Sequence, residues 1–263
     1  MMKYIKALCV IMSFLTFSSI CLNTVSSAEE KCINWYIKKK GHISPDFPIE
    51  CVAVSEHDGY YIDKTAAENG EKIIYLTFDA GYENGNVEKV VNILNEYNVK
   101  GAFFILSQII LKNPNTVKKM FETGHLVCNH TKNHKNMSTL TKAEMKDNLK
   151  ALEELCFNTT GYQMTKYFRF PEGKFSLRTL EQASEFGYKT FFWSLAYADW
   201  DNNELTSEAK AIDKIINNTH PGCILLMHPT SDINVKIMPT LIEKWIDMGY
   251  SFGTLDQLVA RNS

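Results

Sequence analysis

Short apolar runs alternate with longer amphipathic segments from residue 72 to the C-terminal end of the chain. The apolar runs have the length of buried β-strands, and the amphipathic segments repeat their apolar residues at the period of an α-helix. In residues 86–97, for example, Val87, Val90, Val91 and Leu94 share one helical face. About seven such strand–helix units predict an α/β fold whose parallel sheet closes, or nearly closes, into a distorted (β/α) barrel.

The apolar pattern also gives boundaries for these elements. The predicted strands are residues 73–78, 102–106, 126–129, 167–170, 190–195, 223–227 and 250–254. The predicted helices are residues 86–97, 115–122, 142–157, 177–186, 208–217 and 237–248. The chain is 45% hydrophobic, which is enough for one sizeable core, and its formal net charge of −2 does not suggest nucleic-acid binding.

Polar fragments close several of the predicted strands. Asp79, His130, Arg169, Asp199 and His228 all fall at or just beyond a strand's carboxyl end. In a β/α barrel the carboxyl ends of the strands form one rim, and that rim carries the active site. We therefore expect these five side chains to lie near one another.

His130 and His134 form an H-x-x-x-H pattern. On a helical turn this spacing points both imidazoles the same way, so that they could hold one metal ion. The alternative is a pair of solvated surface histidines. The position after a strand favours a metal site, where a divalent ion would polarise a carbonyl and lower the pKa of a bound water.

The other rim residues suggest acid–base chemistry. Asp79 ends a buried strand and needs a partner, for which Arg169 is suited because a guanidinium can hold a carboxylate bidentately. The pair is either a structural salt bridge or a tethered general base. His228 is either a plain rim residue or a general acid, which Asp199 would keep charged and oriented. We expect an apolar wall beside it, or else plain core, from Trp200, Leu226 and Met227.

The N-terminal region reads as a targeting segment. Lys3 and Lys6 precede an apolar run over residues 7–22, and residues 26–28 offer small side chains for cleavage. The alternative, a permanent membrane anchor, is less favoured because the run is short and rich in Ser and Thr. We predict a signal peptide over residues 1–28, an irregular N-terminal extension packed on the barrel over 29–70, and a catalytic domain over 71–263. Among the remaining cysteines, Cys32 and Cys51 are the one pair worth testing for a disulfide.

The motifs TFDAGYE, NHTKNH, RFPEG, DW and LLMH together resemble those of the polysaccharide deacetylase (NodB-homology, carbohydrate esterase) family. The resemblance covers roughly residues 72–258, and jointly the motifs are specific. Within the family, the fragments around Ile33–Trp35, Pro45-Asp46, residues 75–84 and 192–200 are similar to the muramic-δ-lactam-forming de-N-acetylases of spore-forming bacteria.

The resemblance implies the NodB-homology fold, a distorted (β/α) barrel with fewer than eight regular repeats. It implies Asp79 as the base, tethered by Arg169, and His228 as the acid, supported by Asp199. The oxyanion would be held by the metal and by a backbone N–H near Glu172. The residues expected to contact the substrate are Trp200, Leu226, Tyr82, Pro171 and Glu172.

One position departs from the family pattern. The family places a second aspartate, a metal ligand, where this chain has Ala80. The muramic-acting subgroup is also altered there and usually carries Asn. The resemblance thus implies His130 and His134 as the metal ligands. It implies a divalent ion, with zinc and several others suitable, that binds weakly because the carboxylate is missing.

These observations predict an exported peptidoglycan N-deacetylase in the cell wall or spore cortex space. Its substrate would be N-acetylmuramic residues of peptide-stripped glycan strands, and the product would lead to muramic δ-lactam. The alternatives are an N-acetylglucosamine deacetylase, acting on peptidoglycan or a chitin-like polymer, and an inactive carbohydrate-binding member of the fold. The expected partners are peptidoglycan glycan strands, with no nucleic acid and no stable membrane insertion after signal cleavage, and the expected state is a monomer.

Overall fold

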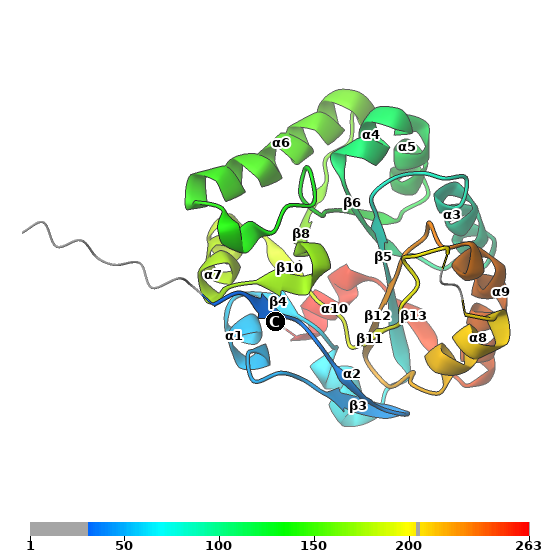
Figure 1. The fold of residues 1–263 in the computed structure, drawn as a ribbon. Coiled ribbons are helices and arrows are strands. Elements are labelled where there is room, and N and C mark those ends of the chain that lie inside the picture. The colour runs from blue at the N-terminus through cyan, green and yellow to red at the C-terminus, as the bar shows by residue number, and fades with distance from the viewer. Residues whose placement is uncertain (1–30, 204–205, 263) are drawn as a thin grey trace, which may run out of the picture. The chain divides into compact units, whose positions relative to one another are not determined.

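The fold is built around one curled parallel sheet. The computed structural model describes residues 31–203 and 206–262, so the predicted signal peptide lies outside the described residues. Eight strands follow the spatial order β11-β12-β5-β6-β7-β8-β10-β4, and β13 pairs with the first half of β5 (Figure 1). An isolated bridge joins Ile62, just beyond the edge strand β4, to Cys223 at the start of β12, the second strand from the opposite edge. The predicted distorted barrel is confirmed.

The strands of this sheet are β4 (Gly59–Tyr60), β5 (Ile73–Ala80), β6 (Ala102–Ile105), β7 (Leu126–Asn129), β8 (Thr165–Phe168), β10 (Lys189–Phe191), β11 (Leu195–Ala196), β12 (Cys223–Met227) and β13 (Ser251–Gly253). The helices after β5 are α3 (Val87–Glu96), α4 (Ser107–Lys112), α5 (Pro114–Glu122), α6 (Lys142–Thr160), α7 (Leu177–Glu185), α8 (Glu208–Ile216), α9 (Asp232–Asp247) and α10 (Leu255–Asn262). Two short 3-10 helices also occur, η1 (Met137–Thr139) and η2 (Pro171–Gly173).

Several predicted boundaries need correction. The strand predicted over 190–195 is two strands, β10 and β11, separated by a turn of the chain. The helix predicted over 237–248 begins earlier, at Asp232, directly after Ser231 in the N-cap position, and continues through Pro239. Helices α4 and α10 were not predicted, because the apolar residues of such short helices do not establish a period.

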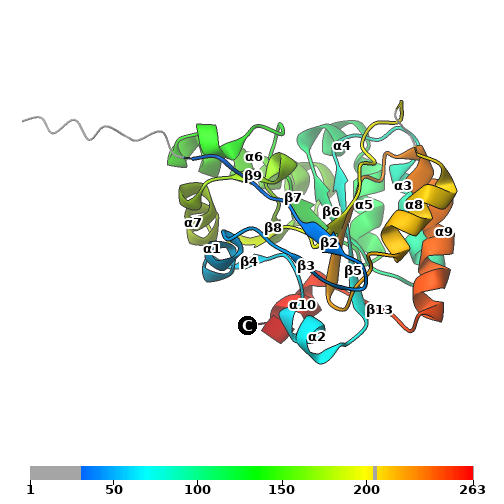
Figure 2. The same ribbon diagram turned by 60° about the horizontal axis from the view of Figure 1, so that its bottom comes forward.

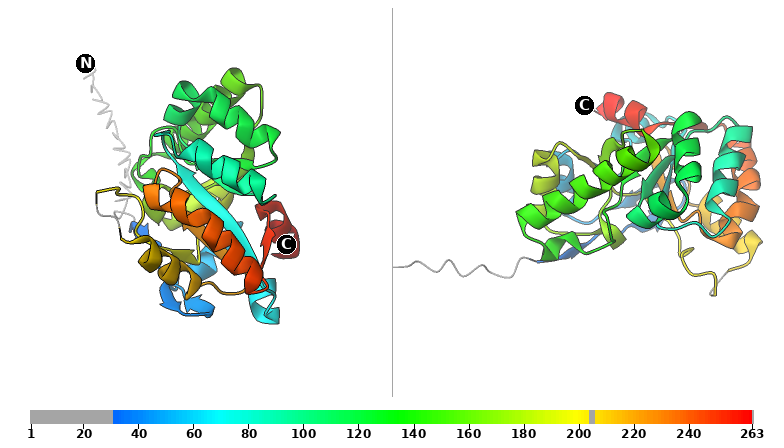
Figure 3. Two further views of the ribbon diagram at one scale, coloured as in Figure 1. Left: turned by 90° about the vertical axis from the view of Figure 1, so that its right-hand side faces the viewer. Right: turned by 90° about the horizontal axis from the view of Figure 1, so that it is seen from above.

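The central strand β5 shows how the core is divided. Because strand side chains alternate, Ile74, Leu76 and Phe78 face the outer apolar layer, which α3 and α9 cover side by side (Figure 3). Tyr75 points to the opposite face, into an inner cluster that α10 closes with Leu255 and Leu258. This alternation places Thr77 and Asp79 on the inner face, where the barrel opens toward the rim.

The segment before β5 is more regular than predicted. It contains β1 (Ile33–Asn34), β2 (Lys38–Lys40), β3 (Ile43–Asp46), α1 (Cys51–Glu56) and α2 (Lys64–Asn69) in addition to β4. Strand β1 pairs with β9 (Lys174–Phe175), and β4 is an edge strand of the main sheet. Figure 2 shows this segment, in blue, along the outside of the sheet. The expectation of an irregular extension was therefore wrong, because strands this short show no alternation in sequence.

None of the helices among the described residues has the length and apolar character needed to cross a bilayer. The described cysteines, including Cys32 and Cys51, are free thiols, so the structure contains no disulfide between these two. Cys128, in β7, and Cys223, in β12, are completely buried.

Candidate active site

The predicted rim residues meet at one end of the barrel. Asp79 is the penultimate residue of β5, while His130, Arg169 and His228 directly follow β7, β8 and β12. Asp199 lies three residues beyond the end of β11. The carboxyl ends of parallel strands share one edge, so residues distant in sequence come together there.

The carboxylate of Asp79 is held by Arg169. The Arg169 Nη1 donates to Asp79 Oδ1 over 2.8 Å. The contact is a single hydrogen bond and not the bidentate pair predicted, because Nη2 donates instead to Thr77 Oγ1 and to the Phe192 carbonyl. This arrangement leaves Asp79 Oδ2 outside the guanidinium fork.

Arg169 is itself completely buried and makes four hydrogen bonds. Its Nε donates to the Phe191 carbonyl over 2.9 Å, and its guanidinium lies 4.2 Å from the ring centroid of Phe104. A buried cation with four hydrogen bonds has one fixed orientation. Arg169 therefore fixes the position of Asp79 rather than offering a charge to the cavity.

Burial alone would raise the pKa of Asp79. The charges of His130, Arg169 and His228, together with the Arg169 hydrogen bond, outweigh burial and hold this pKa below its ordinary value. Burial lowers the pKa of His130 to about 4, so that ring is neutral at neutral pH. At neutral pH the permanent charge of Arg169 therefore favours the ionised form of Asp79, and this carboxylate is available to accept a proton.

His130 and His134 do come together, but not on a helical turn. The intervening residues form a loop in which Thr131 and His134 have φ values of 76° and 58°. The His134 N–H donates to Thr131 Oγ1 over 2.9 Å, and the two imidazole centroids lie 5.0 Å apart. The predicted helix was wrong, since two left-handed residues end any helix. The predicted proximity is confirmed by this different geometry.

The His130 ring has a defined tautomer. Its Nδ1 lies 3.0 Å from the Arg169 carbonyl, which can only accept, so Nδ1 carries the proton. The lone pair on Nε2 is then directed toward Asp79 Oδ2 at 3.5 Å, and two acceptors face each other. A cation next to these atoms would resolve that conflict, so the pair of imidazoles fits a divalent metal ion with few protein ligands.

Position 80 adds no ligand to the two imidazoles. Ala80 is fully buried in the outer apolar layer, on the strand face opposite to Asp79. Among residues 31–203 and 206–262, no group of three or more His, Cys, Asp or Glu side chains could hold a metal ion. Two imidazoles thus remain as the nitrogen ligands.

His228 is supported by Asp199 as predicted. The His228 Nδ1–H donates to Asp199 Oδ1 over 2.7 Å, and the His228 backbone N–H donates to Oδ2 over 2.8 Å. Burial lowers the pKa of His228, but the hydrogen bond and charge of Asp199, and the charge of Asp79, raise it above its ordinary value. The imidazole is therefore biased toward its protonated form, with Nε2 as the nitrogen not used by Asp199.

A cavity of about 710 Å³ joins these groups. Its lining residues are Asp79, Gly81, Tyr82, Leu106, His130, His134, Glu172, Gly173, Trp193, Ala196, Tyr197, Trp200, Leu226, His228 and Thr230. Four of the residues predicted to contact the substrate line this cavity, namely Tyr82, Glu172, Trp200 and Leu226. Pro171 is buried and does not line the cavity. Met227 points into the outer apolar layer, because it follows Leu226 on the strand.

The wall near Glu172 needs a glycine. Gly173 has a φ of 65°, and a Cβ there would lie 2.8 Å from the Trp193 ring and 3.0 Å from the Trp35 Cβ. Glu172 also has a positive φ, 56°. The two consecutive left-handed residues turn the chain sharply at the cavity edge, with Gly173 N–H donating to the Phe170 carbonyl over 3.0 Å.

Three residues of the site were missed from sequence. Thr77 bonds Arg169 and could have been found, since it lies two residues before Asp79 on the same strand face. Asn234 donates to Asp199, and Tyr197 donates to Asn234. Asn234 was missed because α9 was predicted to begin after it, although Ser231 followed by Asp232 is a typical helix start.

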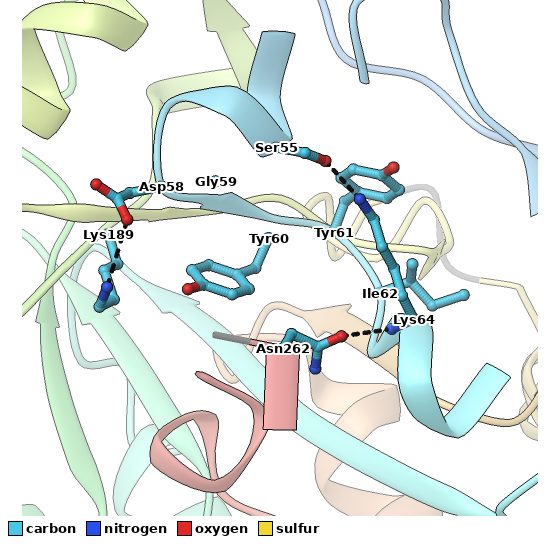
Figure 4. Close-up of a pocket in the computed structure, with 9 residues that line it drawn as sticks. All are labelled: Ser55, Asp58, Gly59, Tyr60, Tyr61, Ile62, Lys64, Lys189 and Asn262. Carbon is cyan, nitrogen blue, oxygen red and sulfur yellow. Dashed lines mark hydrogen bonds and ion pairs between the residues drawn. The ribbon is translucent and has the colours of Figure 1, made fainter. Parts of the chain in front are cut away.

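A second cavity, of about 390 Å³, lies beside the edge strand β4 and shares no lining residue with the first (Figure 4). Its two lysines have partners: Lys64 Nζ donates to Ser55 Oγ over 2.8 Å, and Lys189 Nζ lies 3.5 Å from Asp58. This cavity contains none of the predicted site residues.

Comparison with known proteins gives a consistent answer. Residues 66–191 match the model of the polysaccharide deacetylase family. The chain is 35% identical over 229 residues to the peptidoglycan-N-acetylmuramic acid deacetylase PdaA of Bacillus subtilis, covering 86% of each protein. The solved structure of PdaA, described as a family 4 carbohydrate esterase, matches with a TM-score of 0.84 and 34% identity. That match covers 89% of this chain and 99% of PdaA.

Two more distant relatives differ in what their names state. A peptidoglycan-N-acetylglucosamine deacetylase of Bacillus cereus is 30% identical over 193 residues, covering 70% of this chain and 67% of the relative. The structure of a family 4 pseudoenzyme from Bacillus anthracis matches with a TM-score of 0.68 and 25% identity, covering 76% of this chain and 68% of the other.

Proposed function

This chain belongs to the polysaccharide deacetylase family, and we propose that it removes the N-acetyl group from N-acetylmuramic residues of peptidoglycan whose stem peptides have been removed. One observation carries the proposal. A carboxylate anchored by a buried arginine and an imidazole anchored by a buried carboxylate line the same cavity. That is the pair of groups that amide hydrolysis by water requires.

In the proposed reaction, Asp79 accepts a proton from a water molecule as the water oxygen bonds to the amide carbonyl carbon. Oδ2 is suited to this step because Oδ1 is bound to Arg169. His228 then donates its Nε2 proton to the nitrogen as the carbon–nitrogen bond breaks, which releases acetate and a free amine. Asp199 stabilises the imidazolium beforehand and keeps Nδ1 occupied.

The proposal includes a divalent metal ion as a cofactor. Family members are commonly metal-dependent. His130 and His134 would hold a divalent ion, which when bound supplies polarisation of the carbonyl and acidification of water. A backbone N–H near Glu172 would add to the oxyanion stabilisation. We expect weak binding, because Ala80 supplies no third ligand.

Deacetylation of a muramic residue would lead to muramic δ-lactam. The freed amine of a muramic residue lies on the same sugar as the lactyl carboxylate, and closure between them with loss of water gives muramic δ-lactam. The similarity to a muramic deacetylase over 86% of the chain supports this choice. The proposal includes export to the cell wall or spore cortex space, where glycan strands occur.

A specific observation favours a second candidate, a deacetylase of N-acetylglucosamine residues. Among the residues that the structure describes, none of those lining this cavity is a lysine or arginine that would pair with a lactyl carboxylate. Mass spectrometry of peptide-free glycan strands after incubation distinguishes the two. Loss of acetyl from muramic residues supports the first proposal, whereas loss from glucosamine residues or chitin oligomers alone would replace it with the second.

An inactive carbohydrate-binding protein is the third candidate, motivated by Ala80 and by the existence of a family 4 pseudoenzyme. The anchored Asp79 and His228 argue against it, since a binding module needs neither a base nor an acid. Acetate release that is the same in the wild type, Asp79→Asn and His228→Ala would show that the catalytic assignment is wrong.

A further inference from the structure

Behind the Asp199–His228 pair lies a buried asparagine that belongs to no motif. Asn234 is in the first turn of α9 and is completely buried. Its Nδ2 donates to Asp199 Oδ2 over 2.6 Å and to the His228 carbonyl over 2.9 Å. One amide group thus contacts both the carboxylate and the main chain of the histidine that this carboxylate supports.

The orientation of this amide is fixed by Tyr197. The Tyr197 hydroxyl donates to Asn234 Oδ1. Burial and then the charge of Asp199 raise the Tyr197 pKa, so the phenol stays neutral and keeps its proton. The opposite orientation of the Asn234 amide would point its oxygen at a carboxylate and a carbonyl, which are both acceptors.

The two oxygens of Asp199 therefore accept hydrogen bonds from different donors. Oδ2 accepts from the backbone N–H of His228 and from Asn234, and Oδ1 accepts from the imidazole. Without Asn234 the Asp199 carboxylate would lose the side-chain donor that holds Oδ2. Its remaining donors among the described residues would be the backbone N–H and the imidazole of His228, so the carboxylate would be held less firmly against the imidazole.

We infer that Asn234 is a positioning residue for the general acid, which acts by fixing the Asp199 carboxylate and the His228 main chain so that Nδ1 stays bonded and Nε2 faces the cavity. This inference rests on the proposed function. Asn234 does not line the cavity, so its effect must pass through His228. The other charged groups that face His228 are Asp79 and Arg169, and neither contacts Asn234 by a hydrogen bond among the described residues.

The test uses the leaving group. Amide cleavage needs a proton on nitrogen, whereas cleavage of p-nitrophenyl acetate does not, because its phenolate leaves unassisted. Asn234→Leu keeps the volume and removes the amide. We expect the ratio of glycan deacetylation to p-nitrophenyl acetate hydrolysis to fall about ten- to hundredfold, as for loss of a hydrogen bond to a charged group. Tyr197→Phe should lower the ratio about two- to tenfold.

Asn86→Leu is the matched control. Asn86 is another buried asparagine, and its Nδ2 donates to the Thr230 carbonyl, on the loop that follows His228, and to Asp232 Oδ1, at the start of α9. In Asn86→Leu the ratio of glycan deacetylation to p-nitrophenyl acetate hydrolysis should equal that of the wild type. A fall as large as that of Asn234→Leu would overturn the inference in favour of a general disturbance of the loop.

A second measurement does not depend on turnover. In NMR spectra of protein with ¹⁵N-labelled histidine, the His228 Nδ1 proton is assigned by its loss in His228→Ala. We expect this proton to exchange at least tenfold faster in Asn234→Leu and Tyr197→Phe, and unchanged in Asn86→Leu. Equal exchange rates in all variants would overturn the inference and leave the proposed function standing. The same holds if the ratio is unchanged in Asn234→Leu and Tyr197→Phe while His228→Ala lowers it. An unchanged ratio in His228→Ala would remove the proposed acid and the inference together.

Discussion

Replacing Arg169 by Met tests whether the barrel interior depends on the buried ion pair. The substitution removes the hydrogen bonds to Asp79, Thr77 and the Phe191 and Phe192 carbonyls at once. It leaves Asp79, whose side chain is only 10% exposed, without the cation that contacts it directly. Breaking a buried pair by removing one partner costs about 3–5 kcal/mol, because the remaining charge is uncompensated.

We therefore expect the free energy of unfolding of Arg169→Met to fall by about 3–5 kcal/mol in urea denaturation. The unfolding free energy of Arg169→Lys should lie between those of the wild type and Arg169→Met. An ammonium can reach Asp79 but cannot also bond the three other acceptors. Lys119→Met is the control. Lys119 lies 3.0 Å from Glu88 with both side chains exposed, and its loss should cost about 0–1 kcal/mol. A loss in Arg169→Met no larger than in the control would refute the reasoning.

Three further predictions concern His228, Ala80 and Trp200. The raised pKa means that protonated His228 adds stability, complete below about pH 6.5 and lost as the pH rises through the folded pKa. The wild type should therefore exceed His228→Gln in unfolding free energy by more near about pH 6 than near about pH 9, and equal differences would contradict this. Ala80→Asp should unfold more easily than the wild type, because it buries a charge in the outer apolar layer, and it should gain no more melting temperature from added zinc, because its side chain faces away from Asp79. A larger gain from zinc than in the wild type would contradict this placement of the side chain. Trp200 is 65% exposed and lines the cavity, so Trp200→Ala should raise KM on the order of tenfold with little change in kcat, and a change in kcat alone would refute its role as a wall.

The sheet was predictable from sequence because its strands are buried on both faces. Such strands appear as continuous apolar runs, and the run at 223–227 coincides with β12 at both ends. The rim residues were predictable for a related reason. A polar residue that directly follows a buried parallel strand lies at the rim formed by the strands' carboxyl ends. Asp79 and His228 were found in this way.

The rest depended on contacts that sequence spacing does not encode. His130 and His134 meet through a loop with two left-handed residues, which a spacing rule reads as a helix. Asn234 reaches Asp199 from another element, so no local pattern marks it. Of the strands before β5, β1 and β4 pair with β9 and β10, which lie far along the chain, and β2 and β3 pair with each other. Tertiary pairing decides such short segments.

The central claim is that Asp79 and His228 hydrolyse an N-acetyl amide in this cavity. The most direct measurement is quantification of free acetate released from peptide-free glycan strands by the purified protein, with Asp79→Asn compared at equal folded concentration. We predict steady acetate release by the wild type and a loss of at least about 100-fold in the variant, the scale of general base catalysis. No acetate from the wild type, or equal release by both proteins, would contradict the account.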